Sequence, residues 1–236
     1  MGRLKFIRLY IIAVLLEASF SSLHGQTNDN YIKGIRYYSE NKFLLAIGSF
    51  KKAIGDGLND PKVYFFLGNS YANNGDNDKA IEQFKLSLEL ADDPVLQSLI
   101  THNIGYVYYL MKDYKSSIDY LSRAYQMNSN LVQSFWYEGM AYYRLKDKAN
   151  TIKEWEEYLD KDPQGPQSDN IRKALDILKT GKFNIEKDIL FSSESTNPET
   201  NSQPSVEPLI NIEGVLDQVK PVDKGKTSDT QLEDIE

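Results

Sequence analysis

Few side chains in this sequence could carry out chemistry. The 236 residues contain no cysteine and only two histidines. Thiolate nucleophiles, disulfides, iron–sulfur clusters and cysteine zinc sites are therefore excluded. Because His24 lies in a segment that we expect to be removed, a Ser-His-Asp mechanism would depend on His102 alone. The sequence pattern places neither a serine nor a dedicated acid beside His102, so we interpret it as a packed or solvent-wetted imidazole.

A group of five acids within nine residues could also suggest a catalytic or metal-binding cluster. We interpret these acids as the solvated face of a helix: Glu154, Glu156, Glu157, Asp160 and Asp162. The chain has no phosphate-binding glycine loop, and the Asn/Asp-rich stretch 73–78 lacks EF-hand spacing. The sequence therefore predicts a protein that is not an enzyme, with no cofactor and no metal site.

Most of the net charge belongs to the end of the chain. Residues 192–236 contain ten acids and three lysines, a net charge of −7, which equals that of the whole chain. The pattern shows no clustering of Lys and Arg that would indicate a nucleic-acid footprint. We therefore expect neither nucleic acid nor a small-molecule substrate as a partner.

The first 25 residues have the order of regions found in a secretory signal. A short basic start is followed by an apolar run over 9–16, then by Glu17 and small residues. Eight apolar residues are too few to span a bilayer, which takes about 20. We expect residues 1–25 to be a signal peptide, cleaved after Gly25 or alternatively after Ser21 or Ser22, and the protein to be periplasmic. An uncleaved leader would instead anchor it to the membrane.

Four glycines mark an internal repeat in the middle of the chain. Gly34, Gly68, Gly105 and Gly139 are spaced by 34, 37 and 34 residues. A tyrosine follows each glycine by three residues, a small residue by twelve and a large apolar residue by sixteen. These columns are Tyr37, Tyr71, Tyr108, Tyr142; Ala46, Ala80, Ser117, Thr151; and Phe50, Phe84, Leu121, Trp155. Such a period indicates a solenoid of stacked units.

This pattern closely resembles the tetratricopeptide repeat, a helix–turn–helix unit of 34 residues, and covers residues 27–164. The resemblance implies an all-α fold, an α-solenoid of about four repeats within a domain over 26–180. The repeats are expected over 27–60, 61–97, 98–131 and 132–165. Lys33, Glu138 and Tyr158 depart from the family pattern, which we attribute to missing packing partners in end copies.

The second copy shows the expected helix–turn–helix unit in detail. Apolar residues at helical spacing predict helices over 61–74 and 78–91. The intervening Asn-Gly-Asp-Asn sequence is typical of a turn. There Gly75 can adopt a left-handed conformation, and Asp76 or Asn77 can cap the second helix.

The region after the repeats is expected to close the array and then lose order. Residues 167–180 carry Ile171, Leu175 and Leu178 on one helical face, as a capping helix requires. A short extension follows over 181–191, and the composition of 192–236 predicts a disordered acidic tail. Its apolar stretch 209–216 is either an unbound segment or a short motif that folds on a partner or on this protein's own groove.

The resemblance also implies a partner-binding groove. In tetratricopeptide arrays the first helix of each unit lines a concave face, where ligand contacts gather. Exposed aromatic side chains there suit a docked peptide or helix, although neighbouring helices could instead bury them. The corresponding residues are Tyr31, Ile35, Tyr38, Phe65, Asn69, Asn73, His102, Asn103, Tyr106, Tyr109, Trp136, Met140, Tyr143 and Arg144.

Chaperone-binding members of the family hold a C-terminal carboxylate in a clamp of asparagines and cations. Asn69 and Asn103 match its asparagines, but Phe65, Gln133 and Tyr137 occupy the three cation positions. Without those cations a carboxylate lacks its strong charge-assisted donors. We therefore predict that this chain has no carboxylate clamp.

Together these features predict a non-catalytic protein–protein interaction scaffold or assembly factor of a bacterial cell envelope, which binds a peptide or helix segment in its groove. Two alternatives stay open. The tail could bind the partner while the solenoid serves as a mount, or the protein could be an accessory subunit of an envelope enzyme complex. Self-association through the end repeats is also open.

Overall fold

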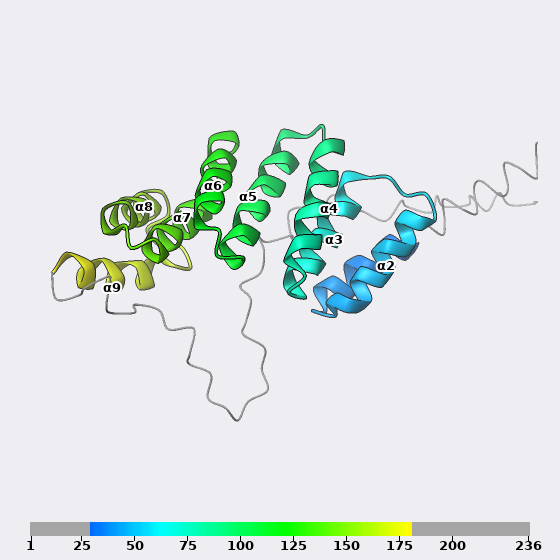
Figure 1. Ribbon diagram of the computed structural model, residues 1–236, viewed down its shortest axis with the longest axis horizontal. Helices are drawn as coiled ribbons and strands as arrows, with labels where there is room; N and C mark the ends of the chain where they lie inside the picture. Colours follow the sequence, from blue (N-terminus) through cyan, green and yellow to red (C-terminus); the bar gives the residue numbers. More distant parts are fainter. Residues whose placement is uncertain (1–28, 181–236) are drawn as a thin grey trace, which may run out of the picture. The chain divides into compact units, whose positions relative to one another are not determined.

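The computed structural model describes residues 29–180, and all its regular structure is helical (Figure 1). The signal peptide predicted over 1–25, the extension over 181–191 and the tail over 192–236 lie outside these residues. Among the helices of residues 29–180, none combines the length and the hydrophobicity that a membrane span requires. A helix through residues 29–39 precedes α2 (Phe43–Gly55), α3 (Pro61–Asn73), α4 (Asn77–Leu90), α5 (Pro94–Leu110), α6 (Tyr114–Met127), α7 (Gln133–Arg144), α8 (Lys148–Lys161) and α9 (Ser168–Lys179).

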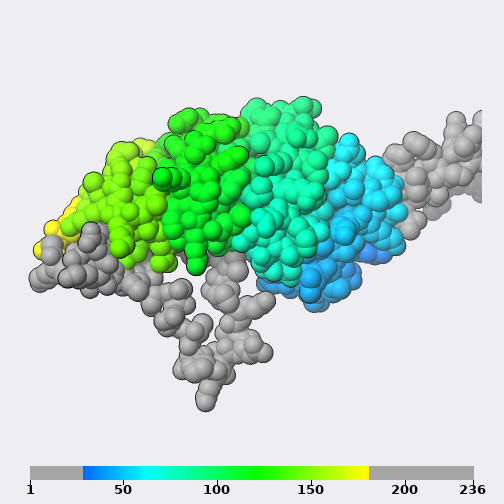
Figure 2. All heavy atoms as spheres, in the orientation of Figure 1, coloured from blue at the N-terminus to red at the C-terminus, as the bar shows by residue number. Residues whose placement is uncertain are grey.

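Each helix packs mainly on the helices that precede and follow it in the chain. The contacts within a pair, as between α3 and α4, are accompanied by contacts between pairs, as between α4 and α5. Figure 2 shows the atoms of one unit touching those of the next. A solenoid of this kind buries its apolar surface between neighbouring units, because each unit alone is too small to do so.

The turn inside every repeat has the same backbone conformation. Asn41, Gly75, Lys112 and Lys146 have φ angles of 57°, 85°, 64° and 63°, in the left-handed region. The expectation for Gly75 is therefore confirmed. The second helix of that repeat runs over Asn77–Leu90, one residue earlier than predicted, and its N-cap Asp76 makes no side-chain capping hydrogen bond. In the next two repeats, Asp113 and Asp147 do make such bonds.

The repeat glycines allow the two helices of each unit to approach closely. A Cβ atom added at Gly34, Gly68, Gly105 or Gly139 would lie 2.4, 2.7, 2.8 or 2.3 Å from a side-chain atom sixteen residues later. Those side chains are fully buried: Phe50, Phe84, Leu121 and Trp155. The glycines and the large apolar residues of the sequence repeat are therefore the two sides of one contact, which occurs in all four repeats.

The predicted capping helix is present as α9. Ile171, Leu175 and Leu178 are buried in one apolar cluster with Trp136 and Trp155. This cluster joins α9 to both helices of the last repeat. The polar face of α9 stays exposed, so the array ends in a surface that water can solvate.

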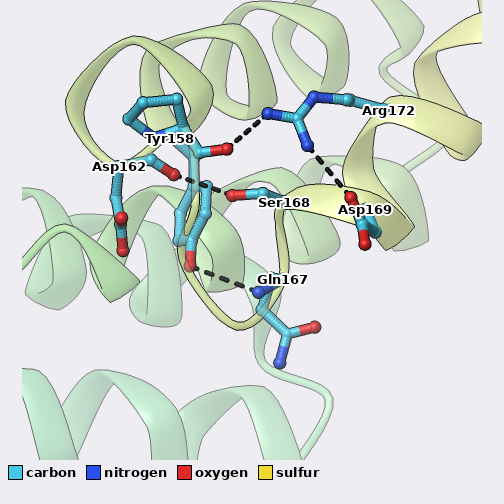
Figure 3. Close-up of polar contacts among 7 residues, drawn as sticks. Tyr158, Asp162, Gln167, Ser168, Asp169 and Arg172 are labelled. Carbon is cyan, nitrogen blue, oxygen red and sulfur yellow. Dashed lines mark hydrogen bonds and ion pairs between the residues drawn. The ribbon is translucent and has the colours of Figure 1, made fainter.

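Hydrogen bonds fix the entry of the chain into α9 (Figure 3). The Ser168 Oγ donates to the Asp162 carbonyl oxygen at 2.7 Å, and the backbone N–H of Gln167 donates to the Tyr158 hydroxyl at 3.4 Å. Arg172 forms an ion pair with Asp169 at 3.0 Å and donates to the carbonyl oxygen of Pro163. The junction is therefore held by side chains on both of its sides.

Candidate functional site

Most of the residues predicted to line a groove are covered by neighbouring helices. Ten of the fourteen are buried, which leaves four that are partly accessible to a partner: Ile35, Asn73, Tyr109 and Arg144. The buried ones are Tyr31, Tyr38, Phe65, Asn69, His102, Asn103, Tyr106, Trp136, Met140 and Tyr143. Several of their rings pack on neighbouring helices, since Tyr31 and Tyr38 contact Phe66 of α3 and Trp136 stacks on Trp155 of α8. Their main contribution is therefore packing.

One group of accessible aromatic side chains does form where α5, α6 and α7 meet. The ring of Tyr109 lies 5.7 Å from that of Tyr114 and 6.2 Å from that of Tyr137. All three are partly exposed. Beneath them, Tyr137 packs on buried Tyr106, with ring centroids 4.8 Å apart, and on buried His102, at 5.9 Å.

Arg144 at the end of α7 completes this group. Its pKa is affected by a side-chain hydrogen bond with Tyr109 and by the nearby Tyr114 and Tyr143. Burial lowers the pKa of the guanidinium, but these tyrosines outweigh that effect, and the net pKa is raised. We refer to Tyr109, Tyr114, Tyr137 and Arg144 as the tyrosine–arginine surface.

The tyrosine–arginine surface has the composition of a protein-binding site. Tyrosine and arginine are enriched among the residues that contribute most to binding energy at interfaces. Tyrosine offers a large apolar face with a polar hydroxyl at its edge, at a small cost in conformational entropy. A partner segment could therefore pack on the rings while its polar atoms meet the hydroxyls and the guanidinium.

Sequence comparison identifies the repeats themselves. The profile of the tetratricopeptide repeat matches residues 59–130, and a second tetratricopeptide-repeat profile matches residues 133–165. This chain is a tetratricopeptide-repeat protein. The predicted family and the predicted all-α solenoid are thereby confirmed. Tetratricopeptide-repeat proteins generally mediate protein–protein interaction or assembly, and their domains bind protein or peptide partners.

Individual relatives of this tetratricopeptide-repeat protein are distant. Photosystem I assembly protein Ycf3 of Acaryochloris marina (strain MBIC 11017) is 27% identical over 98 residues, which cover 42% of this chain and 59% of that protein. The match thus spans less than two thirds of the relative.

Solved structures resemble the tetratricopeptide-repeat domain in fold. MamA 41-end from Desulfovibrio magneticus RS-1 has a TM-score of 0.58 at 19% identity, over 66% of this chain and 85% of that one. PilF of Pseudomonas aeruginosa has a TM-score of 0.57 at 16% identity, over 68% of this chain and 72% of that one. At such identities the likeness concerns the fold alone.

The two asparagines that match the family's carboxylate clamp bind each other in this tetratricopeptide-repeat domain. The Asn103 Nδ2 donates to the Asn69 Oδ1 at 2.9 Å, and both side chains are buried. Within the described residues, the Asn69 Nδ2 and the Asn103 Oδ1 have no hydrogen-bond partner. Phe65 is buried too, whereas Gln133 and Tyr137 are partly exposed. The absence of a clamp stays a prediction, because no bound peptide tests it.

The environment of His102 differs from the sequence expectation. We expected no serine beside it, but the Ser134 Oγ of the next repeat lies 3.0 Å from the His102 Nδ1. Both side chains are fully buried, and burial lowers the pKa of His102 to about 3. The imidazole is therefore neutral at physiological pH. Since neither group reaches solvent, we interpret the pair as a hydrogen bond that joins α5 to α7 rather than a nucleophile and its base.

The interpretation of the acidic group on α8 is wrong for one of its five members. Glu154 is buried, while the other four are partly or fully exposed. Glu154 pairs with Lys153 at 2.9 Å and lies near buried Glu138 of α7. Burial, and then the charge of Glu154, raises the pKa of Glu138 to about 8. No three potential metal ligands gather anywhere in residues 29–180.

Sequence reasoning did not include Tyr114 and Tyr137 among the site residues. From the sequence, Tyr137 was assigned only to a position where the clamp would need a cation. Tyr114 starts the second helix of its repeat, whereas the family's contacts lie on first helices. One signal could have found them, namely the density of tyrosine at the end of α5, at the start of α6 and along α7.

Proposed function

We propose that this protein is an exported, non-catalytic assembly factor or scaffold of a bacterial cell envelope, and that it binds a segment of another protein at the tyrosine–arginine surface. The proposal rests on one observation above all: three adjoining tyrosine rings and a guanidinium remain partly exposed in a domain whose other inner aromatics are largely buried. Such clusters are typical of interface residues that contribute most to affinity.

The family and the relative named as an assembly protein support this kind of function. Tetratricopeptide-repeat proteins generally act by holding other proteins. The relative named as an assembly protein shares 27% identity over 98 residues. The likeness supports a role in assembly without indicating the complex that is assembled.

The location belongs to the proposal as well. It rests on residues 1–25, where a basic start, an eight-residue apolar run and small residues follow in the order of a secretory signal. Cleavage of that leader would release the mature protein into the periplasm, whereas retention would attach it to the membrane.

Partner capture by crosslinking, from the native envelope and with the mature chain from residue 26, tests the proposal. Tyr109→Ala and Tyr137→Ala together remove two rings of the surface. We expect this double variant to lose a specific captured protein by at least about tenfold, since one interface anchor contributes on the order of 1–2 kcal/mol. Quantitative mass spectrometry of the captured proteins provides the measurement.

The matched control removes two tyrosines of similar exposure from other repeats, by Tyr37→Ala and Tyr64→Ala. Far-ultraviolet circular dichroism serves to check that the surface variant and the control variant both stay helical. Equal capture by the surface variant and the control would contradict the proposed site. If deleting residues 192–236 alone abolished capture, the tail would be the binding element and the solenoid its mount.

A further inference from the structure

Arg144 has no acidic partner in the described part of the chain. Some cations on the array do have one: Lys79 pairs with Asp76, Lys153 with Glu154, and Lys179 with Glu156. None of the ion pairs among residues 29–180 includes Arg144, although this side chain is partly buried. A half-buried cation loses hydration without gaining a counter-charge, and a carboxylate from outside would supply it.

Two acids that adjoin the surface in the sequence, Asp113 beside Tyr114 and Asp147 three residues after Arg144, are already engaged. Asp113 accepts hydrogen bonds from the backbone N–H of Ser116 at 3.2 Å and from the Ser116 Oγ at 2.7 Å. Asp147 accepts from the backbone N–H of Asn150 at 3.1 Å and from its Nδ2 at 2.7 Å. Each carboxylate holds the first turn of a helix, so moving one to Arg144 would cost that helix its N-cap.

The surroundings of Arg144 are suited to a carboxylate rather than to a phosphate. A guanidinium has five N–H donors in a planar fork, which matches the two oxygens of a carboxylate. The hydroxyl of Tyr109 can accept a bond from Arg144 and still has its own proton to donate to the same anion. One positive charge balances one carboxylate, whereas a phosphate monoester carries almost two negative charges at neutral pH.

We propose that Arg144 and the Tyr109 hydroxyl form an anion site that selects an internal Asp or Glu side chain of the partner, flanked by apolar residues that pack on Tyr114 and Tyr137. Arg144 does not occupy any of the cation positions of the family's clamp, where Phe65, Gln133 and Tyr137 stand. A side-chain carboxylate within a segment, rather than a chain terminus, is its ligand. The inference rests on the proposed function, because it specifies the chemistry of the segment that the tyrosine–arginine surface binds.

A set of synthetic peptides tests this selectivity without knowledge of the natural partner. Each peptide has fifteen residues, acetylated and amidated ends, and two apolar residues on either side of a variable central position. The central residue is Glu, Gln, Lys or phosphoserine. Fluorescence anisotropy measures the Kd of each labelled peptide for the mature chain from residue 26, at low and at physiological salt.

We expect the Glu peptide to bind at least tenfold more tightly than the Gln peptide, and the Lys peptide to bind least. Arg144→Gln should remove the preference for Glu, so that the Kd values of the Glu and Gln peptides for this variant differ by less than about twofold. Arg123→Gln is the matched control, since Arg123 is an exposed arginine of α6 whose guanidinium lies 5.5 Å from the ring centre of Tyr120. That variant should keep the preference.

Three results would overturn the anion site. These are equal Kd values for the Glu and Gln peptides, a Glu preference that survives Arg144→Gln, and a phosphoserine peptide that binds more tightly than the Glu peptide. The experiment is independent of partner capture. If the Tyr109 and Tyr137 variants lose the captured protein while the peptides show no charge preference, the proposed function stands and the anion site fails.

Discussion

The two ends of the repeat array meet solvent in different ways. At the C-terminal end, α9 covers the last repeat and buries Leu178 completely. At the N-terminal end, the described part of the first repeat leaves Ile32, Leu44 and Leu45 exposed by 46%, 70% and 53%. Among the described residues, the last repeat therefore has its apolar face covered by α9, whereas the first repeat leaves apolar side chains open to water.

The position seven residues into the repeat shows the same contrast. Lys33 occupies it in the first repeat and is exposed, as expected for an end copy that lacks a packing partner. Glu138 occupies it in the last repeat but is buried, and Tyr158 of that repeat is buried as well. The expectation that these two residues lack packing partners is therefore wrong. Since α6 packs on α7 and α9 packs on α8, the last repeat is an interior unit.

Truncation of apolar side chains gives the largest expected difference between the ends. Leu178→Ala should lower the free energy of unfolding by about 3 kcal/mol, because it leaves a cavity in the cluster around Trp155. Leu44→Ala should change it by less than about 0.5 kcal/mol, because that side chain already meets water. Urea denaturation followed by circular dichroism measures both, and similar losses would mean that something covers the N-terminal end in solution.

At the C-terminal end, Glu138 should make a contribution to stability that depends on pH between 4 and 8. The pKa of Glu138 is raised from its ordinary value to about 8, so the folded state favours the neutral acid. The stability contributed by neutral Glu138 is fully present below the pKa of this residue in the unfolded chain, near 4.5. It is lost as the pH rises through the folded-state pKa of about 8. Glu138→Gln should therefore raise the unfolding free energy by on the order of 2 kcal/mol at pH 8 and by little at pH 4.

The matched control for that measurement is Lys33→Gln, at the same repeat position in the first unit. Because Lys33 is exposed, this change should have no comparable dependence on pH. Thermal melts of both variants at pH 4, 6 and 8 provide the comparison. A constant difference between Glu138→Gln and the wild type across this range would show that folding does not shift the pKa of Glu138.

The turns give the smallest expected difference. Lys146 of the last repeat and Asn41 of the first have φ angles of 63° and 57°. Asparagine tolerates the left-handed region better than lysine does, and glycine tolerates it best. Lys146→Gly should therefore stabilise the protein by about 0.5–1 kcal/mol, and Asn41→Gly by less. Chemical denaturation can resolve this, and a larger gain at Asn41 would contradict the conformational explanation.

The repeat architecture could be predicted from the sequence because its signals are local. The glycine columns, the turn chemistry around Gly75 and the apolar stripe of the last helix each depend on a few neighbouring residues. Helix boundaries around that turn were predicted to within one residue.

The candidate site was harder to predict, because accessibility depends on how the repeats pack together. Trp136 and Tyr109 occupy equivalent first-helix faces, yet Trp136 is buried against Trp155 and Tyr109 is not. The pairing of His102 with Ser134 spans two repeats and has no counterpart in the repeat pattern. Such contacts follow from the angle and distance between units, which the sequence period does not specify.

The contact between each repeat glycine and its bulky partner also bears on how the protein folds. Both residues belong to the same helical pair and are only sixteen positions apart in the chain. Contacts over such short separations form quickly, because little chain entropy is lost in closing them. Each of the four pairs can therefore act as a separate folding nucleus, from which order spreads to the neighbouring repeats.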